Sequence, residues 1–325
     1  MERWSTSDRQ FVYPEIQDVC PAPLRRCANT DELSLAGAEV REVPEVEMDL
    51  SDLTTFKMNG KAKVIKPLDL SHFEDLLIYF LENKKDFKII GGGSNTVVKD
   101  GIKIPFILTS NLNKYKFDGE YVIAESGVKL SILLSETIKR GISGLEFSIG
   151  IPGTIGGAIF MNTGAFDGEI SKCVESVEII NEEGKTFEMK AEDLKFSYRH
   201  SLFHEKRMWI KKCVLKLQFA KNKEDVLQKS LKNWSRKRST QPITFPSVGC
   251  VFKNPPNEYA ARLIDNANLK GYRVGGVEVS KLHAGFFINV GNATFEDFKA
   301  VYEEVVKRVR EKFGVELESE ITIVS

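Results

Sequence analysis

The sequence predicts an α+β fold made of more than one domain. At 325 residues the chain is longer than a single hydrophobic core usually organises. Segments with helical spacing of apolar residues and segments with strand spacing follow one another without a regular βαβ rhythm. No internal repeat is present. These observations favour two or three α+β domains that share an interface.

The composition points to a small-molecule site in a cytoplasmic protein. Lys plus Arg and Asp plus Glu both number 46, so the chain lacks the net charge that attracts nucleic acid or a membrane surface. Its five cysteines form no CxxC pair, which favours reduced thiols and leaves no readable zinc site. The sequence has no long apolar stretch, so we expect neither export nor a membrane span. We also expect a monomer or a weak oligomer. The cysteines are Cys20, Cys27, Cys173, Cys213 and Cys250.

The chain opens with a leader, residues 1–45, that mixes charges and prolines without a sustained period. Residues 71–85 then show a serine cap followed by helical apolar spacing, and residues 130–141 show helical spacing again. Short β-branched or alternating runs surround these helices. The strands predicted in this half are 62–70, 87–90, 95–101, 105–110 and 121–128.

In the second half, residues 174–194 alternate apolar and polar around Glu183 and Gly184, which predicts a hairpin. A lysine-rich helical pattern runs from 223 to 238. We expect a further helix over 258–271, ending at Gly271. The remaining predicted elements are a strand at 209–220, a strand at 285–291, a long amphipathic helix at 294–314 and a closing strand at 318–325.

Three successive glycines, Gly91, Gly92 and Gly93, stand between two apolar runs. A dinucleotide-binding fingerprint needs GxGxxG between a strand and a helix, and here a β-branched pair follows the loop instead. We therefore expect a strand, a tight loop and a second strand, with backbone N–H groups forming an anion-binding nest. A glycine-rich hairpin turn without a ligand is the alternative.

A second glycine-rich segment occupies residues 144–170. Each glycine carries an entropic cost and packs no side chain, so such density disfavours both helix and strand. We expect this segment to let the backbone approach a ligand, with a merely loop-rich segment as the alternative. Its glycines include Gly150, Gly153, Gly156, Gly157, Gly164 and Gly168.

Several blocks resemble, in the same order, the UDP-N-acetylenolpyruvoylglucosamine reductase family of bacterial cell-wall flavoenzymes. The two glycine segments resemble its flavin-binding signature, FSYRHSLF its Tyr-Arg-x-Ser motif, and QPITFPSVGCVFKNP its Gly-Ser-x-Phe-Lys-Asn-Pro region. LTTFKMNGKA, AARLIDNANLKG, VEVSKLHAGFFIN and LESEITIV resemble further blocks. The series spans residues 53–324 and leaves the leader outside the resemblance.

The resemblance implies a vanillyl-alcohol-oxidase/PCMH-type FAD-binding fold over residues 46–218, in two subdomains split near residue 110. A C-terminal α+β substrate domain would follow at 219–325. FAD would be the cofactor, with its pyrophosphate at GGGSN, and NADPH the hydride donor. The cofactor-binding residues so implied are Thr55, Gly91, Gly92, Gly93, Ser94, Asn95, Gly153, Thr154 and Gly157.

The family's reaction passes hydride from NADPH through FAD to the enolpyruvyl ether of a UDP-sugar, UDP-N-acetylglucosamine enolpyruvate. This chemistry needs a cation or hydrogen-bond donors beside the substrate carboxylate, and a side chain that protonates the neighbouring carbon. The resemblance assigns the carboxylate to Arg199, support of the intermediate to Glu320 and protonation to Cys250. Cys250 replaces the serine of the best-described relatives, and a thiol with an ordinary pKa of about 8.5 is the stronger acid.

Each of these three residues also has a structural alternative. Arg199 would form an ordinary salt bridge, Glu320 would be a solvated strand carboxylate, and Cys250 would be a small buried hydrophobe. Glu318, two residues earlier on the same predicted strand face, competes with Glu320 for the assignment. The cysteine further predicts sensitivity to thiol alkylation and oxidation.

The resemblance also implies substrate contacts for Tyr198, Lys253 and Asn254, while Tyr259 could stack nearby. His283 would lie near the substrate, with a satisfied histidine at a strand start as the alternative.

Two features separate this chain from other members of the family. Met58 and Asn59 replace a glycine-glycine-proline-like turn of the relatives. The span between Arg199 and Gln241 is too short for a tyrosine-bearing lid, which indicates the lidless subtype.

Two other functions remain open from the sequence. Another flavin oxidoreductase on the same fold would keep the glycine segments but lack the combined set of Tyr198, Arg199, Cys250, Lys253, Asn254 and Glu320. A nucleotide-sugar-binding protein without redox activity would keep the fold and fail to take up FAD.

Overall fold

The computed structural model describes residues 45–325. The predicted leader, with Cys20 and Cys27, lies outside the described residues apart from Glu45. Helices and strands alternate irregularly along the described chain, so the predicted α+β class is confirmed. Within this part of the chain, no helix combines the length and the apolar character needed to cross a bilayer.

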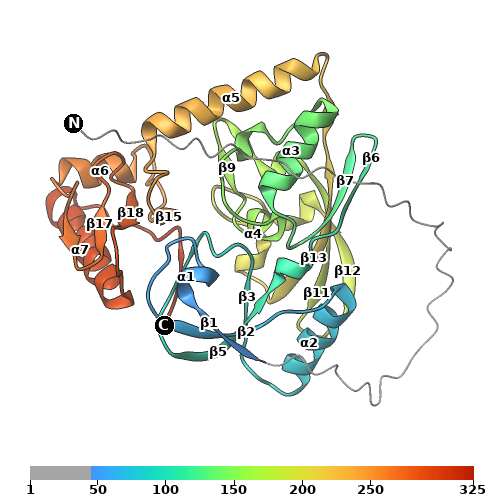
Figure 1. The fold of residues 1–325 in the computed structure, drawn as a ribbon, viewed down its shortest axis with the longest axis horizontal. Helices are drawn as coiled ribbons and strands as arrows, with labels where there is room; N and C mark the ends of the chain where they lie inside the picture. The colour runs from blue at the N-terminus through green and yellow to red at the C-terminus, as the bar shows by residue number, and fades with distance from the viewer. Residues whose placement is uncertain (1–44) are drawn as a thin grey trace, which may run out of the picture. The chain divides into compact units, whose positions relative to one another are not determined.

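A four-stranded sheet in the order β1-β2-β5-β3 opens the described chain (Figure 1). β2, β5 and β3 are parallel, and α2 (Leu70–Glu82) joins β2 to β3. The helix begins one residue before the predicted serine cap, because the Asp69 side chain accepts a hydrogen bond from the His72 N–H. Phe73 and Leu77 of α2 are fully buried, in one cluster with residues of both this sheet and the next. The strands are β1 (Val46–Asp49), β2 (Lys61–Ile65), β3 (Lys88–Ile90) and β5 (Ile102–Leu108).

A second sheet is antiparallel and has the order β12-β11-β13-β7-β6. The predicted hairpin is confirmed, since β11 and β12 pair around the turn at Glu183 and Gly184. The predicted helix at 130–141 is confirmed as α3 (Leu130–Arg140), and its buried leucines pack on this sheet. The edge strand β6 was not predicted. The strands are β6 (Tyr115–Asp118), β7 (Tyr121–Glu125), β11 (Val174–Asn181), β12 (Thr186–Lys190) and β13 (Met208–Lys216).

The glycine-rich segment contains a helix that the sequence analysis did not predict. α4 (Ile155–Phe160) carries two glycines, yet Ile155, Ala158 and Ile159 are buried in the core of the second sheet. The Thr154 hydroxyl caps the helix by accepting a hydrogen bond from the Gly157 N–H at 3.4 Å. Burial of the apolar face, at roughly 25 cal/mol per Å², outweighs the cost of the glycines.

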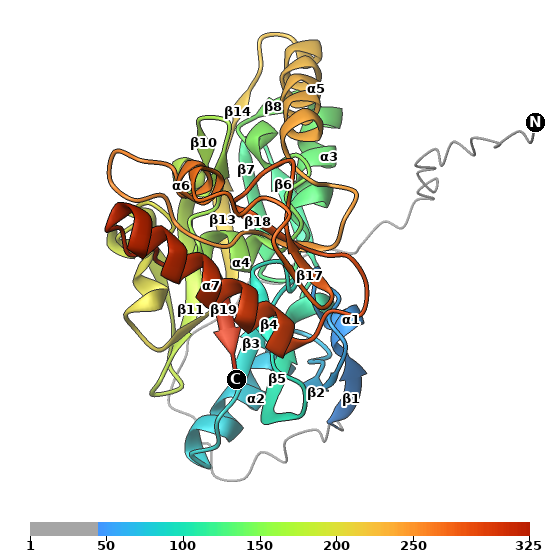
Figure 2. The ribbon, with the colours of Figure 1, turned by 90° about the vertical axis from the view of Figure 1, so that its left-hand side faces the viewer.

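The C-terminal elements form a third sheet, ordered β15-β18-β17-β16, with α6 (Ala260–Asn266) and the long helix α7 (Phe295–Phe313) packed on it (Figure 2). α6 ends at Asn266, five residues before the predicted stop at Gly271, because the chain turns at Ala267 and Asn268 to bury Leu269. The strands are β15 (Ser247–Cys250), β16 (Arg273–Val274), β17 (Val277–Val279) and β18 (Phe286–Asn289).

Two connections tie the C-terminal elements to the N-terminal ones. β19 (Thr322–Val324) is shorter than the predicted closing strand and pairs in parallel with β4 (Thr96–Val98), directly after the first glycine loop. Phe56 and Met58 are buried in the same core cluster as α7. The closing strand is therefore bound to the N-terminal half of the described chain directly after that loop.

α5 (Lys223–Thr240) confirms the lysine-rich helix, contacts α3 and runs toward the C-terminal elements (Figure 1). Asn222 caps it by accepting a hydrogen bond from the Glu224 N–H. From its carboxyl end the chain reaches β15 within seven residues. This helix thus connects the second sheet to the strand that carries Cys250.

Candidate active site

One large cavity gathers most of the residues that the sequence analysis selected. Its volume is about 1810 Å³, larger than the roughly 300–1,000 Å³ of an ordinary ligand pocket, so it has room for two ligands at once. Both glycine segments line it, and so do Thr55 and the three proposed catalytic residues. Those lining residues are Thr55, Gly91, Gly92, Gly93, Ser94, Asn95, Gly153, Thr154, Gly157, Arg199, Cys250 and Glu320.

The first glycine loop connects β3 to β4, which is the predicted arrangement of strand, tight loop and strand. Within residues 45–325, the N–H groups of Gly92, Gly93, Ser94 and Asn95 donate to no other protein group. Such a row of free donors in a cavity wall suits an anionic group such as a phosphate.

The two glycine segments pack directly against each other. A side chain at Gly91 would meet the Thr154 hydroxyl at 2.4 Å, and one at Gly92 would meet the Gly153 Cα at 2.8 Å. Gly93 has a φ of +59°, and its carbonyl accepts a hydrogen bond from the Thr55 N–H. Part of the glycine requirement therefore comes from contact between loops, a reason that the sequence analysis did not consider.

Gly157 has a different reason to be glycine. It is exposed in the cavity wall, and the nearest atom to an added Cβ is 3.6 Å away, an ordinary contact distance. The fold itself would accept alanine at this helical position. The missing side chain instead leaves space inside the cavity, as expected where a flat ligand lies against α4.

Arg199 and Glu320 form an ion pair in the cavity wall. The Arg199 Nε donates to the Glu320 Oε1 at 2.7 Å, and a terminal guanidinium nitrogen donates to the Gly164 carbonyl at 2.9 Å. Arg199 has a φ of +53°, a strained value held by the two reciprocal backbone hydrogen bonds of Ser197 and His200. Burial raises the pKa of Glu320 above its usual range, although Arg199 opposes that shift.

Cys250, at the end of β15, faces the same cavity and is partly exposed to it. Burial, and after it the charge of Glu320, raises the pKa of the Cys250 thiol to about 12, against the opposing charges of Arg199 and Lys237. The ordinary thiol pKa assumed from the sequence is therefore wrong. The thiol keeps its proton throughout the neutral range, and its alkylation at neutral pH should be slow.

Asn95 of the first glycine loop and Thr55, which donates to that loop, also contact the segments that carry Glu320 and Cys250. The Asn95 side-chain amide donates to the Glu320 carbonyl at 3.0 Å. The Thr55 hydroxyl donates to the Ser247 carbonyl at 2.7 Å, three residues before Cys250. Both residues were selected for cofactor binding, and the structure gives each a positioning contact as well.

Comparison with known proteins shows which family has a sequence and fold similar to this chain. A family model described as an FAD binding domain matches residues 62–190, and one described as the C-terminal domain of UDP-N-acetylenolpyruvoylglucosamine reductase matches residues 241–324. The reductase of that name from Caldicellulosiruptor bescii is 40% identical over 279 residues, 85% of this chain and 88% of the relative. The chain belongs to the UDP-N-acetylenolpyruvoylglucosamine reductase family.

Further relatives agree with this membership. The reductase of that name from Thermotoga sp. is 38% identical over 299 residues, 90% of this chain and 96% of the relative. The crystal structure of the reductase from Thermus caldophilus is 30% identical with a TM-score of 0.74, covering 87% of this chain and all of the other. The predicted family and its FAD-binding fold are confirmed, and the free N–H groups and the space at Gly157 fit FAD.

Four residues that the reductase resemblance assigned to the substrate do not line the cavity. The Tyr198 ring lies under the Arg199 guanidinium, whose carbon is 5.1 Å from the ring centroid. The Tyr198 hydroxyl accepts from the Asn254 N–H at 3.4 Å, while Lys253 pairs with Glu318 at 2.5 Å. His283 is bonded to its own loop, its Nδ1 accepting from the Gly285 N–H. The cavity therefore contains Glu320 and excludes its competitor Glu318, which is exposed.

The sequence analysis did not select two residues of α5 that line the cavity. Trp234 and Lys237 of α5 both line the cavity and both contact Gly150. The Lys237 ammonium donates to the Gly150 carbonyl at 2.6 Å. The spacing of apolar residues in α5 could not show which face of the helix is buried, because the helix is polar along its whole length. A tryptophan within a lysine-rich helix was the available hint.

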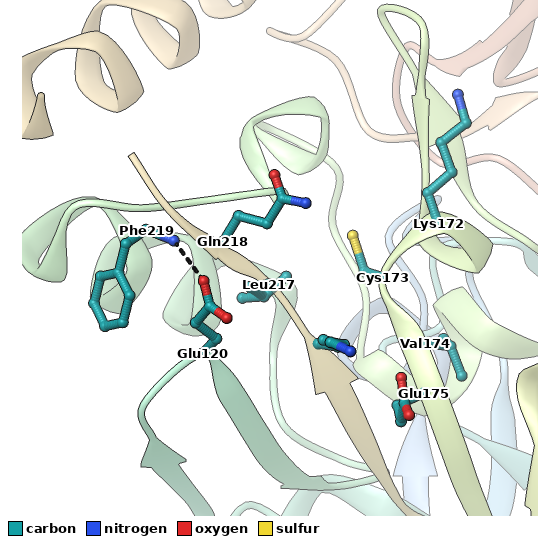
Figure 3. Close-up of a pocket in the computed structure, with 9 residues that line it drawn as sticks. Glu120, Lys172, Cys173, Val174, Glu175, Leu217, Gln218 and Phe219 are labelled. Carbon is teal, nitrogen blue, oxygen red and sulfur yellow. Dashed lines mark hydrogen bonds between the residues drawn. The ribbon is translucent and has the colours of Figure 1, made fainter. Parts of the chain in front are cut away.

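A smaller cavity of about 460 Å³ lies elsewhere, between β11 and β14 (Gln218–Phe219) (Figure 3). Glu120 accepts a hydrogen bond from the Phe219 N–H there, and the buried Cys173 donates to the Gly144 carbonyl. This cavity contains none of the residues that the family resemblance selected.

Replacing Gly157 with alanine should change protein stability and flavin affinity in opposite directions. Without FAD, the free energy of unfolding should rise by up to about 1 kcal/mol, because alanine is the better helix residue. FAD binding should weaken by about 1–3 kcal/mol, because the methyl group enters the cofactor's space. Urea unfolding of the apoprotein and fluorescence titration with FAD measure the two effects.

Gly156→Ala is the matched control for this prediction. A Cβ at Gly156 would meet the Ser126 Cβ at 2.8 Å, so this variant should destabilise the apoprotein. If Gly157→Ala binds FAD as tightly as the wild type, the cofactor does not lie against this part of α4.

Proposed function

We propose that this chain catalyses the NADPH-dependent reduction of UDP-N-acetylglucosamine enolpyruvate to UDP-N-acetylmuramate, a step of peptidoglycan precursor synthesis. FAD, when bound, supplies the redox chemistry between the two substrates. The observation that carries the proposal is the convergence of Arg199, Glu320 and Cys250 on one cavity whose wall is the glycine loop.

Arg199 would bind the substrate carboxylate. Its guanidinium stays charged at any working pH and still has donors beyond those used for Glu320 and Gly164. Glu320 holds this guanidinium in place and would support the enolate-like substrate intermediate through its second oxygen. The loop hydrogen bonds at Ser197 and His200 fix the orientation before the substrate arrives.

Cys250 would protonate the substrate carbon next to the carboxylate. A neutral thiol in the cavity wall can donate a proton there without bringing a second positive charge beside Arg199. Tyr198, Lys253, Asn254 and His283 would contact only parts of the substrate that extend beyond the cavity, since these residues lie outside its lining.

We also propose the domain boundaries, the localisation and the assembly. Residues 46–218 would bind FAD in two subdomains divided near residue 110, and residues 219–325 would bind the UDP-sugar. Residues between Arg199 and Gln241 form β13, β14 and α5, which supports the lidless subtype. The enzyme would act in the cytoplasm as a monomer or weak oligomer, without nucleic acid.

The decisive experiment is an anaerobic stopped-flow record of flavin absorbance on the FAD-loaded protein. NADPH should bleach the flavin, and UDP-N-acetylglucosamine enolpyruvate should then restore its colour. Bleaching without restoration would indicate another flavin oxidoreductase. A protein that cannot be loaded with FAD would instead be a nucleotide-sugar-binding protein.

A further inference from the structure

The tight turn that carries Arg199 is held from behind the cavity wall by the segment that follows α4. Asn162 is only 1% exposed and is not among the residues that line the cavity. Its side-chain amide donates to the Ser197 carbonyl at 2.8 Å. The same carbonyl accepts from the His200 N–H, in the reciprocal pair that holds Arg199 at a φ of +53°. One buried side chain is therefore bonded to the turn from which the guanidinium extends.

Asn162 is itself fixed by its surroundings. Its φ is +43°, a left-handed value that asparagine adopts more readily than most residues. Its Oδ1 accepts a hydrogen bond from the Ser171 N–H at 3.2 Å. Because that N–H can only donate, the amide oxygen faces Ser171 and the amide nitrogen faces Ser197. The donor that reaches the Arg199 turn thus has a defined direction.

Two further hydrogen bonds join the same two segments. The Ser201 hydroxyl donates to the Phe160 carbonyl at 2.6 Å, and Ser201 is fully buried. A terminal guanidinium nitrogen of Arg199 donates to the Gly164 carbonyl at 2.9 Å. The backbone on both sides of Arg199 and its side chain are therefore all bonded to residues 160–164.

These bonds matter because the backbone of Arg199 is strained. A left-handed φ at a residue other than glycine persists only where the surroundings hold it. Without the Asn162 hydrogen bond, the turn can relax toward ordinary backbone angles and the guanidinium changes direction. A guanidinium binds a carboxylate through two parallel hydrogen bonds only when its planar fork points at the two oxygens.

We propose that Asn162, together with Ser201, is a positioning residue that orients Arg199 for the substrate carboxylate. Asn162 acts through the turn and makes no contact of its own with the cavity. The inference rests on the carboxylate-binding role proposed for Arg199, and it goes beyond that role by naming the side chains that set the direction of the guanidinium.

The test measures ligand binding to the oxidised, FAD-loaded enzyme by calorimetric titration without NADPH, so no turnover is needed. Two ligands are compared, UDP-N-acetylglucosamine enolpyruvate and UDP-N-acetylglucosamine, which lacks the carboxylate. In Asn162→Gly the affinity for the first should fall about tenfold, the scale of one lost hydrogen bond at a buried site. The affinities for the second ligand and for FAD should stay unchanged. Glycine accepts a φ of +43°, so this variant removes the amide without straining the backbone.

Two other variants complete the design. Asn292→Gly is the matched control, because Asn292 also has a left-handed φ, +54°, but is exposed and lies outside the cavity lining. It should leave both affinities unchanged. Ser201→Ala removes one hydroxyl and keeps the shape of the side chain, so it tests the inference even if Asn162→Gly does not fold. It should show the same selective loss for the enolpyruvyl ligand.

A double-mutant cycle with Arg199→Ala identifies the route of the effect. If Asn162 acts through Arg199, Asn162→Gly should change the affinity for the enolpyruvyl ligand by less than about twofold once Arg199 is absent. A loss of about tenfold in both backgrounds would mean that Asn162 supports the cavity as a whole, and it would overturn the inference.

Two further results would overturn it. One is wild-type affinity for the enolpyruvyl ligand in both Asn162→Gly and Ser201→Ala. The other is an equal loss of affinity for both ligands. Failure of the proposed function looks different, because the wild-type enzyme would then bind the two ligands equally and Arg199→Ala would change neither affinity. That outcome would remove the carboxylate site and the inference together.

Discussion

A Cys250→Ala variant should lose about 100-fold to 10,000-fold of the rate at which the enolpyruvyl substrate restores flavin absorbance, the usual contribution of a positioned general acid. The thiol of Cys250 holds a proton at neutral pH because burial raises its pKa to about 12. Alanine offers no proton at this place, so the intermediate must be protonated by water. Stopped-flow absorbance after single-turnover reduction measures the rate.

The same instrument provides the controls for Cys250. Bleaching by NADPH should proceed at the wild-type rate, because no proton leaves the thiol in that half-reaction. Cys250→Ser should recover part of the lost rate, since a serine hydroxyl also carries a proton that it can donate. Cys173→Ala removes a buried thiol of the smaller cavity and should leave both half-reactions intact. Wild-type restoration in Cys250→Ala would exclude the thiol as the proton donor.

An Arg199→Ala variant should lose about 100-fold to 1,000-fold in kcat/KM, the scale on which one charge-stabilising donor acts. The substitution removes the carboxylate-binding guanidinium and leaves Glu320 without its ion-pair partner. Arg199→Lys keeps the charge without the planar fork and should recover only part of the loss. Wild-type kcat/KM in Arg199→Ala would exclude carboxylate binding by this residue.

The pH dependence of kcat/KM distinguishes the role of Glu320 from that of Arg199. Burial raises the pKa of Glu320, so the ion pair is lost as pH falls through a higher value than an ordinary glutamate would give. Arg199 lowers that pKa, and its removal should move the acid limb of kcat/KM to still higher pH. Glu320→Gln should abolish the limb. An acid limb that stays in place in both variants would show that Glu320 does not control it.

Much of the site could be read from local sequence because its residues occur in short motifs. The loop at Gly91 connects two strands as predicted, and α2, α3, α5 and α7 follow their apolar period or caps. α4 was missed because glycine content was judged without its buried face of Ile155 and Ile159. Lys237 was missed because a lysine in a polar helix is usually solvated, whereas this one is buried and donates to the Gly150 carbonyl.

The sequence by itself determined the family, the α+β class and the two glycine segments, since motif order, side-chain period and glycine content are local properties. Tertiary structure alone decided that Arg199 meets Glu320, 121 positions away, and that Glu318 points elsewhere. It also set the thiol pKa of Cys250 and excluded Tyr198 from the cavity lining. The physical reason is that spacing indicates which face a side chain occupies, whereas its partner and its burial depend on the packing of distant segments.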